Sequence, residues 1–272
     1  HYELWVVDDG SSDATWARVQ EAKEQHAQLR AVRLSRNFGK EAATSAGLTF
    51  ARGDVVIVMD GDLQHPPGEL PRMVRRWQEG GVDIVEMVKE ERQREGVLDR
   101  LAAQLYYSVF GLLGGMDLRN QSDFKLMARP VVDAYLTLGE ANLFLRGMVA
   151  WLGFRHVQLP FHVAERTRGS SKWSFSAKVH LAIDSLTSFT TAPLSIITFL
   201  GITFLGLATM LGAQTLWRWW HGVAVEGFTT VILLQLIIGS TLMISLGLIG
   251  LYIGRIYVEV KHRPRFIVSE KL

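Results

Sequence analysis

Two long runs without a charged residue restrict the fold of this chain more than any other feature. They cover residues 192–216 and 228–254 of 272. Each run exceeds the roughly 20 residues that a helix needs to cross the hydrocarbon core of a bilayer. Two helices buried in a soluble core are the alternative, but a pair of such runs rarely occurs in a soluble chain. The sequence therefore predicts two membrane-spanning helices.

The distribution of basic residues predicts the orientation of these helices. The connector 217–227 is rich in Trp and carries one cation, Arg218. The two flanks are more basic, with Lys172 and Lys178 before the first run and a tail, 255–272, after the second. Because cytoplasmic loops carry an excess of Lys and Arg, both flanks are expected in the cytoplasm. The interpretation is a multi-pass protein of the inner (plasma) membrane with a cytoplasmic polar domain.

Composition excludes several other classes. The formal net charge of +2 gives no strong field favouring nucleic acid. Cysteine is absent, which excludes a disulfide framework and a thiolate metal site. Eight Trp and a mean hydropathy of +0.14 agree with a membrane protein.

The first third of the chain alternates short apolar runs with helical segments. Strands are expected at 4–7, 30–34, 55–59 and 82–88, and helices at 14–28, 39–51 and 69–79. Strands separated by helices of this length indicate an α/β domain with a mostly parallel sheet flanked by helices. Ligands of such sheets bind beyond the carboxyl ends of the strands.

Three polar clusters fall at those strand ends. They are Asp8-Asp9, Arg36-Asn37 and the pair Asp60/Asp62. The first two clusters could each be only a turn and a helix cap, and a lone Asp-x-Asp is a weak signal. Their occurrence at three equivalent strand ends favours one shared ligand site.

The segment MDGDLQHPP, at 59–67, has the chemistry of a cation site. Asp60 follows an apolar strand, Gly61 permits a sharp turn, and Asp62 and Gln64 come next. Two carboxylates and an amide oxygen form a hard-oxygen donor set that suits Mg²⁺ or Mn²⁺ carrying a diphosphate.

Five segments together resemble the family 2 glycosyltransferases, which have a nucleotide-sugar-binding α/β fold. They are VVDDGSSD at 6–13, RNFGKEAA at 36–43, MDGDLQHPP at 59–67, SDFKLMAR at 122–129 and RGSSKWSF at 168–175. The resemblance is greatest to the branch that transfers sugars to polyprenyl phosphate, and it covers essentially the whole chain. In that family another strand precedes the one before the Asp-Asp-Gly-Ser turn. This chain begins at the second strand, so we expect exposed sheet edges and an incomplete nucleoside end of the pocket.

The resemblance implies roles for the strand-end residues. Asp8 and Asp9 would contact the nucleoside, and Gly39 and Lys40 would lie against the base or the diphosphate. Asp60 would lie near ribose and diphosphate. The implied metal ligands are Asp60, Asp62 and Gln64, with Mg²⁺ or Mn²⁺ as the cofactor. Asp62 and Asp123 are the implied catalytic residues.

Asp123, in SDFKLMAR, is expected close to the reacting sugar. A phosphate monoester is largely ionised near neutral pH, because its second pKa is about 6. The acceptor therefore needs little help from a general base. Asp123 would orient the phosphate or the sugar, or take one residual proton.

Basic residues between the metal site and the membrane are candidates to bind an anionic lipid. They are Arg92 and Arg100 in the segment 90–100, and Arg168 and Lys172 in the segment 166–175. The apolar stripe that follows, over 98–113, predicts a helix that either packs in the core or lies in the membrane interface. Residues 175–190 form a second candidate interfacial helix. The segment 166–175 is either a plain basic surface loop or a loop that closes over the diphosphate.

These inferences combine into a domain plan and a function. The plan has a cytoplasmic catalytic domain at 1–165, a loop and juxtamembrane helix at 166–191, two transmembrane helices at 192–254 and a basic cytoplasmic tail at 255–272. The expected reaction is metal-dependent, inverting transfer from a UDP- or GDP-linked sugar to polyprenyl phosphate at the cytoplasmic membrane face. No nucleic-acid partner is expected, and self-association is left open. The alternatives are a processive polysaccharide synthase and a non-catalytic scaffold with a degenerate nucleotide site.

Overall fold

The computed structural model describes residues 1–62, 64–89, 122–140, 144–161, 192–222 and 227–272. Its chain divides into two compact units, one made of 1–185 and 262–272 and the other of 186–261. The candidate acceptor residues Arg92, Arg100, Arg168 and Lys172 lie outside the described residues. So do the candidate interfacial helices at 98–113 and 175–190. Their roles stay predictions.

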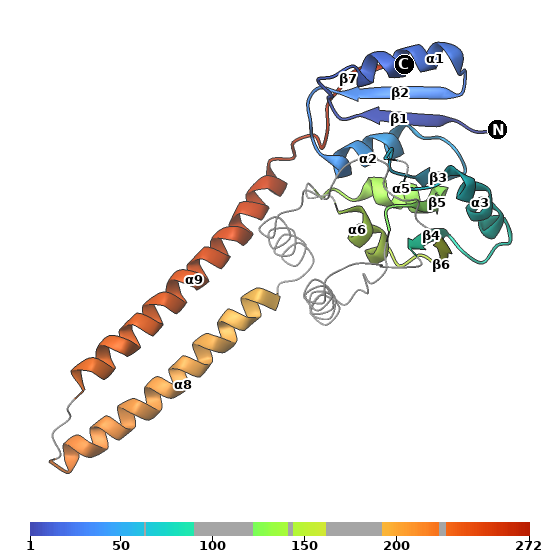
Figure 1. Ribbon diagram of the computed structural model, residues 1–272. Coiled ribbons are helices and arrows are strands. Elements are labelled where there is room, and N and C mark those ends of the chain that lie inside the picture. The colour runs from blue at the N-terminus through green and yellow to red at the C-terminus, as the bar shows by residue number, and fades with distance from the viewer. Residues whose placement is uncertain (63, 90–121, 141–143, 162–191, 223–226) are drawn as a thin grey trace. The chain divides into compact units, whose positions relative to one another are not determined.

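The first unit begins with a three-stranded sheet in the order β1-β2-β7. β1 (Leu4–Asp8) and β2 (Leu29–Leu34) are parallel. β7 (Val268–Lys271) pairs antiparallel with β2. The helices α1 (Thr15–Gln25) and α2 (Lys40–Phe50) pack against β1 and β2 (Figure 1). The strand β7 was not among the elements predicted from the sequence.

A second sheet in the same unit has the order β3-β5-β4-β6. Its strands are β3 (Val55–Val58), β4 (Ile84–Lys89), β5 (Lys125–Ala128) and β6 (His156–Phe161). β5 lies antiparallel between β3 and β4, whereas β4 and β6 are parallel. The described residues that follow β3 also form the helical elements η1 (Pro67–Glu69), α3 (Leu70–Gln78), α5 (Arg129–Thr137) and α6 (Leu145–Trp151).

The predicted α/β class is confirmed, but the sheets are mixed and not mostly parallel. In the first sheet the cause is β7, which pairs antiparallel with β2. In the second sheet it is β5, which lies between two strands that run the other way. Among the described residues β1 pairs only with β2, and β3 only with β5, so each sheet ends at one of these strands.

Side chains from β4, β6, α3 and the segment of β5 with the residue before it form a hydrophobic core against the second sheet. Its buried members are Met73, Val85, Met87, Phe124, Leu126 and Phe161. Burial of such side chains is the main favourable contribution to folding. This core fixes β5 and therefore the segment just before it, which carries Asp123.

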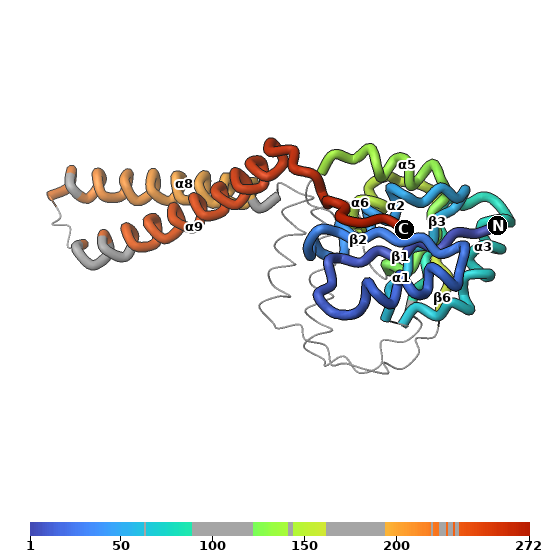
Figure 2. Tube along the Cα trace, turned by 90° about the horizontal axis from the view of Figure 1, so that it is seen from above, coloured from blue at the N-terminus to red at the C-terminus, as the bar shows by residue number. Residues whose placement is uncertain are grey.

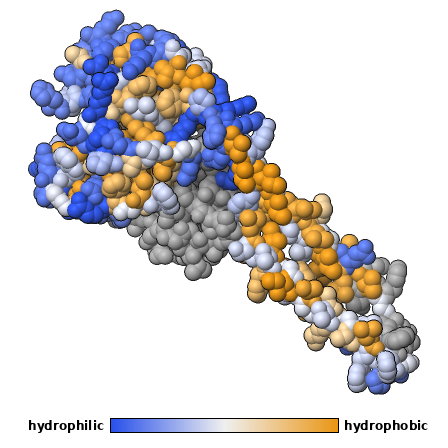
Figure 3. Space-filling model, turned by 180° about the vertical axis from the view of Figure 1, so that it is seen from behind, coloured by the Kyte–Doolittle hydropathy of each residue, from blue (hydrophilic) through white to orange (hydrophobic). Residues whose placement is uncertain are grey.

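The second unit is a hairpin of two long apolar helices, α8 (Ala192–Trp220) and α9 (Phe228–Val260). Both are long and apolar enough to cross a membrane, at Leu194–Arg218 and Leu234–Val260. In both helices none of the most apolar stretch is buried inside the protein, which argues against helices of a soluble core. Large apolar side chains such as Phe199, Met210 and Ile244 are mostly exposed. Figure 3 shows hydrophobic residues, in orange, along much of the hairpin, mixed with paler ones, and Figure 2 shows the two helices running as a pair.

Candidate active site

The first two polar clusters are joined directly by Asp9. Its Oδ1 accepts the backbone N–H of Phe38 at 2.8 Å, and its Oδ2 accepts that of Gly39 at 2.8 Å. Because each carboxylate oxygen can accept more than one hydrogen bond, Asp9 can still accept from a ligand. The turn after β1 and the loop after β2 are therefore one structural piece.

Two glycines permit this close approach. Gly10 has a φ of +70°, and a Cβ there would lie 2.4 Å from the backbone carbon of Arg36. Gly39 precedes α2 with a φ of +96°, and no atom lies within 4 Å of the place where its Cβ would be. Gly10 is thus required by contact, whereas Gly39 is required by conformation and leaves space beside the backbone.

Asp8 faces inward. Its residue is 4% exposed, and its Oδ1 accepts the backbone N–H of Ser11 at 3.1 Å. Its Oδ2 lies 3.3 Å from Nε of Arg33. The predicted contact between Asp8 and a nucleoside remains untested, but the two partners engage this carboxylate within the protein.

Lys40 connects the third cluster to Asp123. Its Nζ lies 2.7 Å from Oδ1 of Asp60 and 2.8 Å from Oδ2 of Asp123. Burial lowers the pKa of Lys40, but hydrogen bonds and charge from Asp123 and then Asp60 outweigh it, so the pKa is raised. Lys40 is the first residue of α2, Asp60 follows β3 and Asp123 precedes β5. The bridge therefore ties the two sheets together at this site.

Arg146 holds Asp123 from the other side. Nε of Arg146 donates to Oδ1 at 2.6 Å and Nη2 donates to Oδ2 at 2.8 Å, a bidentate pair. Burial raises the pKa of the Asp123 carboxyl, but Arg146 and then Lys40 outweigh it and hold that pKa well below its usual range. Asp123 is 8% exposed. It is a fixed anion between two cations.

Arg146 was not among the site residues predicted from the sequence. It sits in α6, where Leu145, Gly147, Met148 and Val149 are buried. A single cation inside an apolar helix was the available signal.

The neighbouring Glu41 accepts the backbone N–H of Leu145 at 3.0 Å, which anchors the start of α6 to α2. Burial raises the pKa of Glu41.

The Asp-x-Asp segment has the chemistry of a divalent-metal site. Asp62 is exposed and its Oδ1 accepts the backbone N–H of Gln64, which closes a turn. Two carboxylates and an amide oxygen fit Mg²⁺ or Mn²⁺. Among the described residues no three His, Asp or Glu side chains gather closely enough to hold a metal alone. A bound metal would take its other ligands from diphosphate oxygens and water. Asp60 would then exchange its ion pair with Lys40 for the metal.

His65 supports this segment without serving it as a ligand. It is 5% exposed, its Nδ1 accepts the backbone N–H of Asp60 at 2.9 Å, and its ring stacks on Phe124 at 4.8 Å. The histidine therefore fixes the backbone at Asp60 to the hydrophobic core that contains Phe124.

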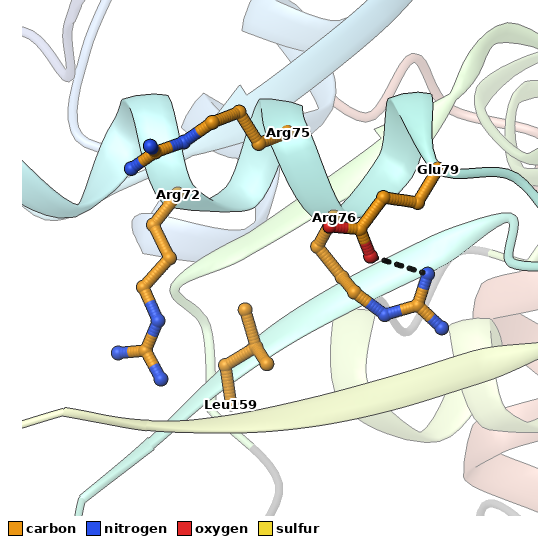
Figure 4. Close-up of a pocket in the computed structure, with 5 residues that line it drawn as sticks. All are labelled: Arg72, Arg75, Arg76, Glu79 and Leu159. Carbon is orange, nitrogen blue, oxygen red and sulfur yellow. Dashed lines mark ion pairs between the residues drawn. The ribbon is translucent and has the colours of Figure 1, made fainter.

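A shallow cavity of about 280 Å³ lies elsewhere, between α3 and β6 (Figure 4). It is lined by Arg72, Arg75, Arg76, Glu79 and Leu159. Arg76 pairs with Glu79 at 3.6 Å, and Arg72 donates to the backbone oxygen of Pro160 at 2.9 Å. None of the predicted site residues lines it, so we do not assign it to the reaction.

The fold has a counterpart among solved structures. A crystal structure of glucosyl-3-phosphoglycerate synthase from Mycobacterium tuberculosis, in complex with Mn²⁺, UDP and glucosyl-3-phosphoglycerate, superposes with a TM-score of 0.50. The alignment covers 69% of this chain and 68% of that one at 22% identity. The fold is therefore the GT-A type of α/β fold used by glycosyltransferases.

Sequence comparison gives the family. Residues 1–130 match the family described as Glycosyl transferase family 2. An uncharacterised glycosyltransferase of Synechocystis is 39% identical over 99% of this chain and 85% of its own length. A bactoprenol glucosyl transferase of Shigella phage SfV is 34% identical over 99% of this chain and 88% of its own. This chain belongs to glycosyl transferase family 2, and the predicted family and enzyme class are confirmed.

Proposed function

We propose that this glycosyltransferase transfers a sugar from a nucleotide-sugar to polyprenyl phosphate at the cytoplasmic face of the membrane. The observation that carries the proposal is the linked cluster Asp60–Lys40–Asp123–Arg146 at the strand ends. The name bactoprenol glucosyl transferase, borne by relatives that align with nearly the whole chain, supports the lipid acceptor. The apolar hairpin supports a membrane location.

The donor half of the site would be built from the three strand-end clusters. Asp9 and the turn after β1 would receive the nucleoside, and the open space at Gly39 would admit the diphosphate. Asp60, Asp62 and Gln64 would hold Mg²⁺ or Mn²⁺, and the Mn²⁺ in the solved relative agrees with this choice. When bound, such an ion offsets charge on the departing diphosphate.

The acceptor half would use cations. Lys40 and Arg146 present positive charge on both sides of Asp123, and Arg92, Arg100, Arg168 and Lys172 stay candidates for the same task. The acceptor phosphate oxygen attacks the anomeric carbon. The bond from that carbon to the diphosphate breaks, and the nucleoside diphosphate leaves with the electron pair. One displacement inverts the anomeric configuration.

Asp123 would act by orientation and charge. Its lowered pKa makes it a weak base. An ionised phosphate acceptor needs no strong base. Alignment of the reactants and electrostatic stabilisation would supply most of the rate enhancement.

The test is release of nucleoside diphosphate by the purified full chain. UDP-glucose and a panel of other UDP- and GDP-sugars are incubated with Mn²⁺ or Mg²⁺, with and without undecaprenyl phosphate. We expect release to require both the metal and the lipid, and Asp62→Asn to abolish it. No stimulation by the lipid would reject the proposal. A polymeric product would indicate a processive synthase, and no turnover with any donor would indicate a scaffold.

A further inference from the structure

The last residues of the chain belong to the sheet that carries the first polar cluster. The chain leaves α9 after Val260, and residues 262–272 are part of the first unit. Leu272 N–H donates to Ala31 O at 2.9 Å and Ser35 N–H donates to Ile267 O at 2.9 Å. Figures 1 and 2 both show the C-terminus beside β2. In sequence, therefore, the apolar hairpin is an insertion within this unit and not an appendage at its end.

The register of β7 places one acidic side chain opposite one basic side chain. Glu270 is the partner of Arg33 across the antiparallel pair. Oε1 of Glu270 lies 3.3 Å from Nη1 of Arg33, and its Oε2 accepts Nε1–H of Trp16 at 2.9 Å. Both carboxylate oxygens are thus engaged, and α1 fixes the second of them.

Arg33 extends from this contact to the turn after β1. Its Nη2 donates to the backbone oxygen of Ser11 at 2.9 Å. Its Nε lies 3.3 Å from Oδ2 of Asp8, an oxygen that is buried and accepts no hydrogen bond among the described residues. The planar guanidinium therefore has a different partner at each of its three nitrogens.

We propose that Glu270 is a positioning residue for nucleotide binding. It fixes the guanidinium of Arg33, which in turn holds the turn from Asp8 to Ser11 in its receptive conformation. The inference rests on the proposed function, because it takes that turn as the nucleoside site. Without Glu270 the guanidinium keeps its contacts to the turn but loses its attachment to β7, so it no longer fixes the turn, which must be ordered again each time a nucleotide binds.

The test is nucleotide affinity of the full chain in detergent, measured by calorimetry with UDP, and separately with GDP, in the presence of MnCl₂. We expect Glu270→Ala to weaken binding about 5-fold, which corresponds to the upper end of what a partly exposed salt bridge contributes. Glu270→Gln keeps one acceptor oxygen and should fall between it and the wild type. The KM for the donor should rise while kcat at saturating donor changes little.

Ser269→Ala is the matched control. It removes the hydrogen bond from Ser269 Oγ to the backbone oxygen of Arg33, at 3.1 Å, but leaves the guanidinium untouched. We expect its nucleotide affinity to equal that of the wild type. If Glu270→Ala does not fold, Arg33→Lys tests the same link, because Lys keeps the charge and loses the fork.

Two results would overturn the inference. One is a Glu270→Ala variant that binds nucleotide as tightly as the wild type does. The other is an equal loss of affinity in Ser269→Ala and Glu270→Ala, which would show that β7 acts only through strand stability. A wild type that binds neither UDP nor GDP would instead refute the proposed function itself.

Discussion

At the residue scale the site is governed by charge compensation around Asp123. Arg146 and Lys40 both contact its carboxylate, and Lys40 also contacts Asp60. Buried and half-buried charges are tolerated when they are paired and hydrogen-bonded. The cluster therefore presents cations whose positions are set before any ligand binds, as electrostatic catalysis requires.

Asp123→Asn tests the orienting role of this carboxylate. We expect turnover to fall by about two orders of magnitude or more, since aligned contacts at a reacting centre are worth that much. Nucleotide affinity should stay near normal, because Asp9 is held by the backbone N–H groups of Phe38 and Gly39, which the substitution leaves in place. Calorimetry with UDP and a lipid-dependent turnover assay measure the two quantities. Equal loss of both would contradict the assignment.

Arg146→Ala should reduce kcat strongly, because Asp123 would lose both hydrogen bonds of the bidentate pair. Arg146→Lys is the informative companion. It keeps a positive charge but can supply only a point contact, so we expect partial recovery of kcat. Arg75→Ala, on α3 and remote from the cluster, should leave kcat unchanged. Full activity of Arg146→Lys would show that charge alone suffices.

At the scale of elements, strand-end turns and paired strands place these residues. Gly10 lets the turn after β1 touch the backbone of Arg36, and Asp9 then joins that turn to the start of α2. In the second sheet a buried ion pair between Glu86 and Lys125 joins β4 to β5. Each of these contacts brings together residues that are far apart in the sequence.

Gly10→Ala should destabilise the first unit by about 2 kcal/mol, the typical cost of a residue forced into a rare backbone conformation. The added methyl would also press on Arg36, so nucleotide affinity should fall as well. Gly68→Ala is the control, because no atom lies within 4 Å of its Cβ position. Thermal unfolding of the two variants gives the comparison. Equal melting temperatures would contradict the expected strain.

The pair Glu86–Lys125 should behave as a buried ion pair. The two residues are 4% and 2% exposed, and their charged atoms lie 3.2 Å apart. Glu86→Leu would leave the ammonium of Lys125 buried without its partner and should cost about 3 kcal/mol. The double variant Glu86→Leu/Lys125→Met should recover only part of that loss, because Ser122 N–H and Gln158 Nε2 also donate to Glu86. Urea unfolding measures both. A double variant no more stable than the single one would refute the pairing argument.

At the scale of the whole molecule, a polar unit that carries the candidate site is interrupted in sequence by an apolar hairpin. The hairpin occupies the second compact unit, and the chain afterwards returns to the first. A hairpin delivers the chain back to the side from which it started when both helices cross the bilayer. The two ends of the insertion are then on one face of the membrane.

Single-cysteine labelling tests this topology directly, since the chain has no native cysteine. The two variants are Trp220→Cys and Arg263→Cys. Trp220 is the last residue of α8, and Arg263 follows the end of α9. In intact cells we expect a membrane-impermeant maleimide to label the first variant and spare the second. Permeabilised cells, where both should react, are the control. Labelling of Arg263→Cys in intact cells would contradict the proposed orientation.

Much of the fold could be predicted from the sequence because its signals are local. The strand at Val55–Val58 is a continuous apolar run, and the runs in α8 and α9 exceed a bilayer width in length. Asp60 and Asp62 were identifiable because a strand end and a glycine mark the turn. Arg146 and β7 were missed, since their partners Asp123 and β2 lie far away in the sequence.

The α/β class, the apolar hairpin, the family and the residues at the strand ends were all predictable from local patterns in the chain. Hydrophobic periodicity and turn chemistry act over a few residues and can be recognised without knowing what packs against them. The antiparallel position of β5, the pairing of β7 with β2, and the bridges from Lys40 and Arg146 to Asp123 became evident only from the folded chain. Those features depend on which distant segments meet, and the packing of the whole unit settles that.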